Sequence, residues 1–298
     1  MEEKKRKKEI SMEVRERYIN FYTDYAFKKL FGTAANKDLL IDFLNALFNG
    51  QECITDLSYL NSEQLGGTES DRKAFFDVYC TNDQGDHFIV EMQQNSQKHF
   101  IDRTLYYTSF DVNQQGEQGE WDYRLNKLYV ISILNFVFDH KNPEYFHHEV
   151  LLMDKNLKEV FYDKWKLIYL EMPKFTKKED ELETQFEKWL YAIGNLYRLE
   201  ERPASLKGEI FRRLFEQAEV TKFTRTERMQ YILSRKQMWD EYSKMKSQLE
   251  KGREEGEAIG LGKGRLLERL QMARKLKAMD TPLETIVQVT GLTEEEIK

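Results

Sequence analysis

The segment KLYVISILNFVF, residues 127–138, restricts the fold more than any other stretch, because it is apolar almost without interruption. A strand with one wet face alternates apolar and polar side chains, whereas a strand covered on both faces needs no polar positions. We therefore expect this segment to be a central strand of a sheet that has helices packed on both sides.

The segments before this strand predict the elements around it. TDYAFKKLFG is typical of a short helix that begins after an N-cap at Thr23 and stops at Gly32, and KDLLIDFLNALFNG is typical of an amphipathic helix. Three strand-like segments and another helix follow, in the order CITDLSYLN, FFDVYC, HFIVEMQ and SQKHFIDRTLYYTSFDVNQQG. The order helix, strand, strand, strand, helix, strand predicts an α/β fold with a mixed central sheet flanked by helices.

The rest of the chain changes character after residue 175. Two more strands, YFHHEVLLM and WKLIYLEMPKF, precede a carboxy-terminal region that is helical throughout. The glycines of EGEAIGLGKGR predict a hinge, since glycine in a helix interior costs roughly 1 kcal/mol. The expected organisation is a charged lead-in (1–17), a core with additional strands (18–175), a helical region (176–250), and a basic hinge with short helices (251–298).

Composition sets limits on the class of protein. The formal net charge of -6 gives no overall attraction to nucleic acid, so any such contact must use local basic patches. Cys53 and Cys80 lie in apolar surroundings, which predicts two buried free thiols and a reducing compartment. No segment has the apolar length of a membrane helix, and we expect a soluble, cytoplasmic protein without a membrane partner.

The two strands FFDVYC and HFIVEMQ each carry one acid. If they form a hairpin centred at Gln84, paired residue numbers sum to 168 and Asp77 lies directly opposite Glu91. The opposite face would then be uniformly apolar, with Phe76, Val78, Cys80, Phe88, Val90 and Met92. A slip by one residue would mix acids into that face, which favours this register.

Two facing carboxylates repel each other unless a cation lies between them. A hard divalent ion such as Mg²⁺ binds carboxylate oxygens, and Gln93 would stand on the same face one step further along the strand. The alternative is that Asp77 and Glu91 simply face solvent. Phe75 and Ile89, which share their face, weigh against that alternative.

Several motifs occur together in a known order. The set TDYAFKKLFG, FFDVYC, FIVEMQ, DRTLYYTS and LEMPKF, with the ending LETIVQVTGLTEEEI, resembles the Rpn-type recombination-promoting nuclease and transposase family of the PD-(D/E)XK nuclease superfamily. The resemblance covers nearly the whole chain. It implies a restriction-endonuclease-like core of α-β-β-β-α-β order, Mg²⁺- or Mn²⁺-dependent hydrolysis of DNA, and an association with recombination or mobile elements.

The resemblance also implies site residues. Asp77 matches the family's aspartate on the second core strand, and Glu91 matches the acid of the (D/E)XK element, so both are expected to bind the metal. Gln93 stands where the superfamily more commonly has lysine, and it can only hydrogen-bond where lysine would bring charge. Asp24 matches an acid that joins such sites through a metal-bound water, although the helix dipole equally explains an acid there.

Further candidates are less specific. Arg103 and Tyr106 or Tyr107 lie at helical spacing just after the third strand, and they could face the phosphate or simply pack. Arginine binds phosphate well, which favours a functional role for Arg103, whereas packing is favoured for the tyrosines. Lys73, at the start of its strand, is a substitute cation for the missing lysine or a solvated side chain. The histidines, which are His87, His99, His140, His147 and His148, show no metal-ligand spacing with acids or cysteines.

Three functions remain open from the sequence. The first is a metal-dependent endonuclease whose helical carboxy-terminal region mediates homo-oligomerisation or DNA contact. The second is a non-catalytic DNA-binding protein that keeps the fold and uses the cations Lys263, Arg265, Arg269, Arg274, Lys275 and Lys277. The third is a scaffold that self-associates through residues 238–260, which the predicted hinge disfavours.

Overall fold

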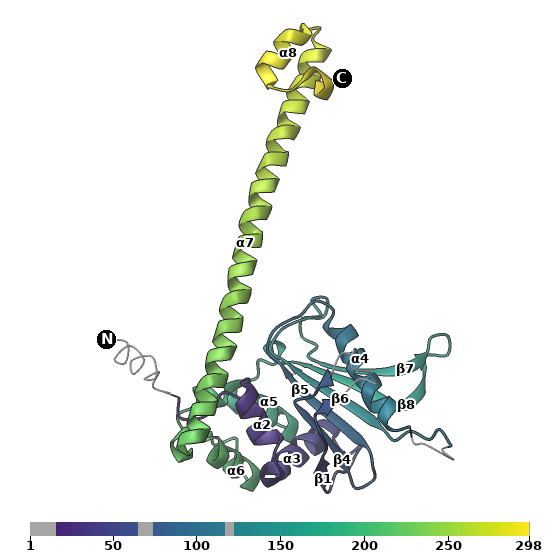
Figure 1. Ribbon diagram of the computed structural model, residues 1–298, viewed down its shortest axis with the longest axis vertical. Helices are drawn as coiled ribbons and strands as arrows, with labels where there is room; N and C mark the ends of the chain where they lie inside the picture. The colour runs from purple at the N-terminus through teal and green to yellow at the C-terminus, as the bar shows by residue number, and fades with distance from the viewer. Residues whose placement is uncertain (1–15, 65–73, 117–121, 298) are drawn as a thin grey trace. The chain divides into compact units, whose positions relative to one another are not determined.

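The computed structural model describes residues 16–64, 74–116 and 122–297 (Figure 1). The chain divides into two compact units after Met238, which coincides with neither predicted boundary at 175 or 250. The predicted lead-in lies largely outside the described residues.

A six-stranded mixed sheet forms the centre of the first unit, in the order β1-β4-β5-β6-β8-β7. Its strands are β1 Leu57–Tyr59, β4 Val78–Asn82, β5 His87–Gln93, β6 Leu128–Leu134, β7 His147–Asp154 and β8 Glu159–Glu171. The β5, β6 and β8 strands are parallel, whereas β1, β4 and β7 run antiparallel to their neighbours. The α/β fold class predicted from the sequence is confirmed.

Helices cover both faces of this sheet. The helices of the first unit are α2 Asp24–Phe31, α3 Lys37–Phe48, α4 Phe100–Gln114, α5 Gln185–Asn195 and α6 Glu209–Ala218. One face packs against α2, α3, α5 and α6, and the other packs against α4. Every residue of β6 is buried between the two layers, as its apolar sequence predicts. The elements α3, β1, β4, β5, α4 and β6 give the expected α-β-β-β-α-β order.

The first two helices begin and end where the sequence predicts. The Thr23 hydroxyl accepts the backbone N–H of Ala26, and Gly32 ends α2 with an N–H bond to the carbonyl of Lys28. The α3 helix ends at Asn49, which adopts the left-handed conformation. Together these caps fix α2 and α3 against the sheet, with Phe27, Phe31 and other apolar residues in the core.

The hairpin that carries the acids has the predicted register but not the predicted first strand. Val78 pairs with Val90 and Thr81 with His87, so the paired numbers sum to 168. FFDVYC, however, is not one strand. Its first part belongs to β3 (Ala74–Phe75), which pairs with β2 (Glu63–Gln64) in a separate two-stranded sheet.

The chain bends at Asp77 between β3 and β4, and this bend corrects the expected faces. Phe76 was expected beside Val78 on the apolar reverse face. It packs instead with Tyr79 and Ile89 on the α4 side, because the bend interrupts the period-two alternation of a strand.

The carboxy-terminal region is built on α7, Arg225–Ala278, which is continuous through the glycines from Gly252 to Gly264. The predicted hinge in this stretch is therefore wrong for the chain's secondary structure. Two short helices follow, α8 (Leu283–Thr290) and α9 (Glu294–Ile297), and Thr293 and Glu296 exchange the expected capping-box hydrogen bonds.

Two further expectations concern the surface. In the described part of the chain, no helix has the length and apolar character needed to cross a membrane. Cys80 is buried as predicted, but Cys53 is exposed, because it lies in the turn after α3 rather than in a strand.

Candidate active site

Two acids are brought together where β4 begins and β5 ends. Glu91 lies in β5 and is only 8% exposed. Asp77 sits in the bend before β4, where its Oδ2 accepts the backbone N–H of Met92 at 2.9 Å. That bond fixes the Asp77 side chain against β5 at the residue next to Glu91, so the two carboxylates interact electrostatically. The bend, rather than strand pairing, positions Asp77.

Both carboxylates are held in an environment that disfavours charge. Burial, and then the nearby charge of Asp77, raise the pKa of Glu91 to about 8, against the lowering effects of Arg103 and of the hydrogen bond from Gln93. Burial likewise raises the pKa of Asp77, although the Met92 N–H and Lys28 act in the opposite direction. The cations among the described residues therefore do not offset the burial of the pair, and a bound cation would add the positive charge that burial calls for.

Gln93 connects Glu91 to a cation. Its Nε2 donates to Glu91 Oε2 at 2.9 Å, and its Oε1 accepts from the Arg103 guanidinium at 2.5 Å. A guanidinium can only donate, so Gln93 must turn its oxygen to Arg103 and its amide nitrogen to Glu91. A lysine at position 93 could not make this bridge, because it has no acceptor.

Arg103 is held from three sides near the first turn of α4. It donates to Gln97 Oε1 at 2.5 Å as well as to Gln93, and its guanidinium lies 5.7 Å from the ring centre of Tyr107. Its charge acts on both Asp77 and Glu91. A cation therefore reaches Gln93 from the helix that follows β5.

Asp24 approaches the site from the start of α2. It pairs with Lys28 at 2.6 Å, one turn further along the helix, and the charges of both residues act on Asp77. Sequence reasoning missed Lys28. The spacing of four residues from Asp24 on a predicted helix was the available signal, since such residues are neighbours on the helix surface.

The remaining candidates from the sequence are Tyr106, Tyr107 and Lys73, and the structure places only the two tyrosines. Tyr107 packs between Arg103 and Phe76, as a structural role requires, while Tyr106 is exposed beside it on α4. Lys73 lies outside the described residues. The structure therefore brings Asp24, Asp77, Glu91, Gln93 and Arg103 toward one place.

The residues present fit a magnesium-type ion better than a zinc-type ion. The described residues contain no group of three or more histidine, cysteine or acidic side chains that could hold a metal. Mg²⁺ does not require such a cage, since it is usually bound by one or two carboxylates together with water and substrate phosphate. The carboxylates of buried Glu91 and partly buried Asp77 therefore fit the donor set that Mg²⁺ or Mn²⁺ takes.

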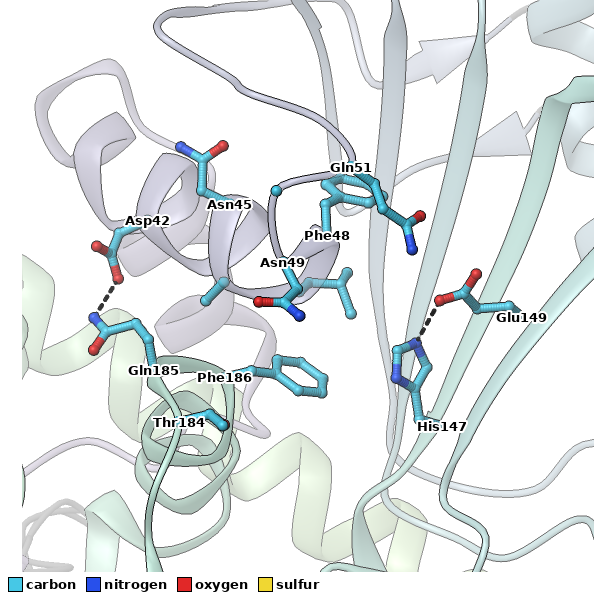
Figure 2. Close-up of a pocket in the computed structure, with 13 residues that line it drawn as sticks. Asp42, Asn45, Phe48, Asn49, Gln51, His147, Glu149, Thr184, Gln185 and Phe186 are labelled. Atoms are coloured by element: carbon cyan, nitrogen blue, oxygen red, sulfur yellow. Dashed lines mark hydrogen bonds and ion pairs between the residues drawn. The ribbon is translucent and has the colours of Figure 1, made fainter.

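A separate cavity of about 570 Å³ lies between α3, α5 and β7 (Figure 2). Asp42, His147 and Glu149 supply its ionisable groups, and none of the predicted site residues line it. Asp42 already accepts hydrogen bonds from Gln185 at 2.8 Å and Trp189 at 2.6 Å. The cavity is therefore distinct from the paired acids, and its Asp42 carboxylate serves to hold α5 against α3.

Comparison with known proteins decides the family. A model of the PD-(D/E)XK nuclease family transposases matches residues 21–248, well over half of the chain. The chain belongs to this family. The match spans all six strands of the large sheet and every described member of the candidate site. Membership in the PD-(D/E)XK nuclease family transposases supports a nuclease-like function, whereas no curated protein and no solved structure matches the chain.

Proposed function

We propose that this protein is a Mg²⁺- or Mn²⁺-dependent DNA endonuclease that hydrolyses phosphodiester bonds, with Asp77 and Glu91 as the metal-binding acids. The observation that carries the proposal is the couple of buried Glu91 and partly buried Asp77, both with raised pKa values, within the residues that match the nuclease family. Structural carboxylates at such burial are normally paired with cations, so a couple that forms no ion pair with any cation in the described part of the chain supports a functional site.

Each side chain has a task in this proposal. A bound ion would supply Lewis acidity and positive charge at the scissile phosphate. Asp77, which accepts the Met92 N–H, and Glu91, which accepts a hydrogen bond from Gln93, would supply the carboxylate oxygens that bind the ion. Gln93 can also orient the attacking water through its amide.

Substrate contacts complete the proposal. Arg103 replaces the superfamily's lysine and stabilises the charge that develops on the phosphate, since guanidinium binds phosphate oxygens well. Asp24 assists through a water on the α2 side. Tyr106 and Lys73 would contact the DNA backbone, and they remain predictions from the sequence.

The wider context is also a proposal. DNA is the substrate that the family implies, and an association with recombination or mobile elements follows from the same membership. With a formal net charge of -6, DNA binding must use local groups such as Arg103 and Lys28. We place the protein in the cytoplasm, and we propose that its carboxy-terminal helices join copies into a homo-oligomer.

The decisive experiment is nicking of supercoiled plasmid DNA by purified protein with EDTA, Mg²⁺ or Mn²⁺. We expect ion-dependent nicking by the parent and a loss of at least about 100-fold in Asp77→Ala and in Glu91→Ala, because metal-held charge is worth several kcal/mol. Asp83→Asn, an exposed acid in the turn of the same hairpin, is the matched control and should nick like the parent.

Two results would contradict the proposal. Nicking that persists in EDTA would show that the activity does not depend on a metal ion. Equal nicking by the parent and by both site variants would show that Asp77 and Glu91 are not the metal-binding acids. Thermal unfolding of each variant shows whether a loss of activity reflects the chemistry or the fold.

A non-catalytic DNA-binding role is the second candidate, and the exposure of six cations along α7 favours it. These residues are Lys263, Arg265, Arg269, Arg274, Lys275 and Lys277. Such a protein would bind DNA with an affinity that falls steeply with salt, and neither Asp77 nor Glu91 would matter. Calorimetry with Mn²⁺ separates the two roles, because only the nuclease should show binding heat that disappears in Asp77→Ala.

A further inference from the structure

The middle of α7 is exposed to solvent along its length. Every residue from 242 to 269 is exposed, including Ile259 and Leu266. Both ends are held, since Asn20 contacts Met238 and Leu270 packs with the cluster of α8 and α9. An isolated helix is marginal in water, and glycines weaken it further. The exposed stretch therefore needs a surface that covers its apolar side.

The exposed stretch has a heptad pattern. One stripe, which we call the seam, consists of Tyr242, Met245, Leu249, Gly252, Gly256, Ile259, Lys263 and Leu266. Its members are separated alternately by three and four residues, the spacing that places side chains on one face for pairing with another helix. A glycine in the seam leaves open space around its Cα, so a second helix can approach closely there. The seam fits another helix better than it fits a nucleic acid or a membrane.

We propose that the occupant is the seam of a second copy of this chain, in an antiparallel pair centred at Glu254. In this register paired numbers sum to 508, and every large apolar position but one meets another. The four layers are Tyr242 with Leu266, Met245 with Lys263, Leu249 with Ile259, and Gly252 with Gly256. The exposed seam begins and ends on residues that pair with each other, so its whole length is covered.

The positions of the charged residues favour an antiparallel pair of helices over a parallel pair. A parallel pair would place Lys263 against Lys263 of the second copy inside the seam, and would set Arg269 beside Arg274 at its edge. The antiparallel pair places Lys263 over Met245, where its aliphatic stem packs and its ammonium reaches water. It also sets the exposed side chains of Trp239 and Leu267 against each other at the edge.

Two like-charge contacts lie close to the two-fold axis, one at each edge of the seam. Arg253 and Glu255 would each have its own copy as its nearest neighbour. Each is already balanced within its own helix, because Arg253 lies 3.6 Å from Glu257 and Glu255 lies 3.9 Å from Lys251, which reduces the repulsion. Both contacts are exposed to solvent, whereas the Lys263 contact of a parallel pair would be inside the seam.

This inference deepens the proposed self-association and does not depend on nuclease activity. Light scattering after size exclusion should give twice the chain mass of 35.8 kDa for the full-length protein. Ile259→Glu should reduce the mass to one chain, because it places two charges in the seam. Leu261→Glu is the matched control, since Leu261 is equally exposed but lies on the opposite side of the helix, and it should leave the mass doubled.

Disulfide formation between co-expressed chains tests the direction. In a background where exposed Cys53 is serine, a chain with Leu249→Cys and a tagged chain with Ile259→Cys should cross-link to each other, and neither should cross-link to itself. Self-cross-linking of each variant would overturn the antiparallel pair in favour of a parallel one. A parent that has the mass of one chain, or equal masses for both glutamate variants, would overturn the seam as the interface while leaving the nuclease proposal untouched.

Discussion

Two glutamates at the carboxyl ends of parallel strands differ in how their charge is balanced. Glu171, at the end of β8, is completely buried and accepts hydrogen bonds from Lys174, from His148 at 2.8 Å and from two backbone N–H groups. Glu91, in β5, accepts a hydrogen bond from the neutral amide of Gln93. The cation Arg103 donates to Gln93 and not directly to Glu91.

The pKa values follow from these partners. Burial alone would raise the pKa of Glu171, but Lys174, His148 and the backbone donors outweigh it and lower the pKa. At Glu91 burial outweighs the lowering effects of Arg103 and Gln93 and raises the pKa, and the neighbouring charge of Asp77 raises it further. A buried acid with a complete set of donors ties the chain together, whereas Glu91 has fewer donors among the described residues, as the proposed metal site requires.

Neutralising Glu171 should destabilise the protein, whereas neutralising Glu91 should not, and this is the largest expected difference between the two glutamates. Glu171→Gln leaves the Lys174 ammonium buried without its counter-ion, and breaking such a pair costs about 3–5 kcal/mol of unfolding free energy. Glu91→Gln removes a charge that burial disfavours, so the metal-free protein should be equally or more stable. Urea unfolding at pH 8 in EDTA measures both. Equal losses in the two variants would contradict the distinction.

The pH dependence of the metal-free protein should show the second contrast. The folded-state pKa of Glu91, about 8, lies above the ordinary value of 4.5. Between these values the unfolded chain loses the proton while the folded chain keeps it, so unfolding free energy should fall by about 2–4 kcal/mol as pH rises. Thermal unfolding from pH 5 to 8.5 in EDTA tests this. Glu91→Gln should flatten the fall, and identical profiles would refute its origin in Glu91.

Arg103 should contribute less than the acids do. Arg103→Ala removes the support of Gln93 and should reduce Mn²⁺-dependent nicking about 10- to 100-fold, as loss of a residue behind a metal ligand typically does. Arg124→Ala, a change at an arginine outside the site, is the control and should leave nicking unchanged. Retention of full activity in Arg103→Ala would show that Gln93 positions Glu91 without help.

Lys28 should have the smallest effect. Its positive charge acts on Asp77 and would repel a second cation there, so Lys28→Met should strengthen Mn²⁺ binding about 2- to 5-fold, within the range of solvent-screened pairs. The control is Lys37→Met, because Lys37 pairs with Asp56 outside the site. Calorimetric titration measures both variants. Equal Mn²⁺ affinities of the two variants would show that the charge of Lys28 does not influence the site.

Much of the fold was predictable because local signals agreed. The caps of α2, the alternation of β5 and the uninterrupted apolar run of β6 each specify one element, and their order specifies the layers. The hairpin register was predictable because only one register keeps the reverse face apolar. The exceptions have a common cause. The bend at Asp77 and the continuous helix through the glycines of α7 depend on distant contacts or on neighbouring helical residues, which a local pattern does not contain.

For the candidate site, the sequence by itself determined the identities of Asp77, Glu91 and Gln93 and the hairpin register that relates them. The tertiary structure decided their environment. Only the folded chain shows that Asp77 is held by the Met92 N–H, and that Arg103 reaches Gln93 from another element. It also shows that, among the described residues, Glu91 has fewer donors than Glu171. The physical reason is that burial and charge balance are sums over groups far apart in the sequence, whereas a strand pattern records only its own residues.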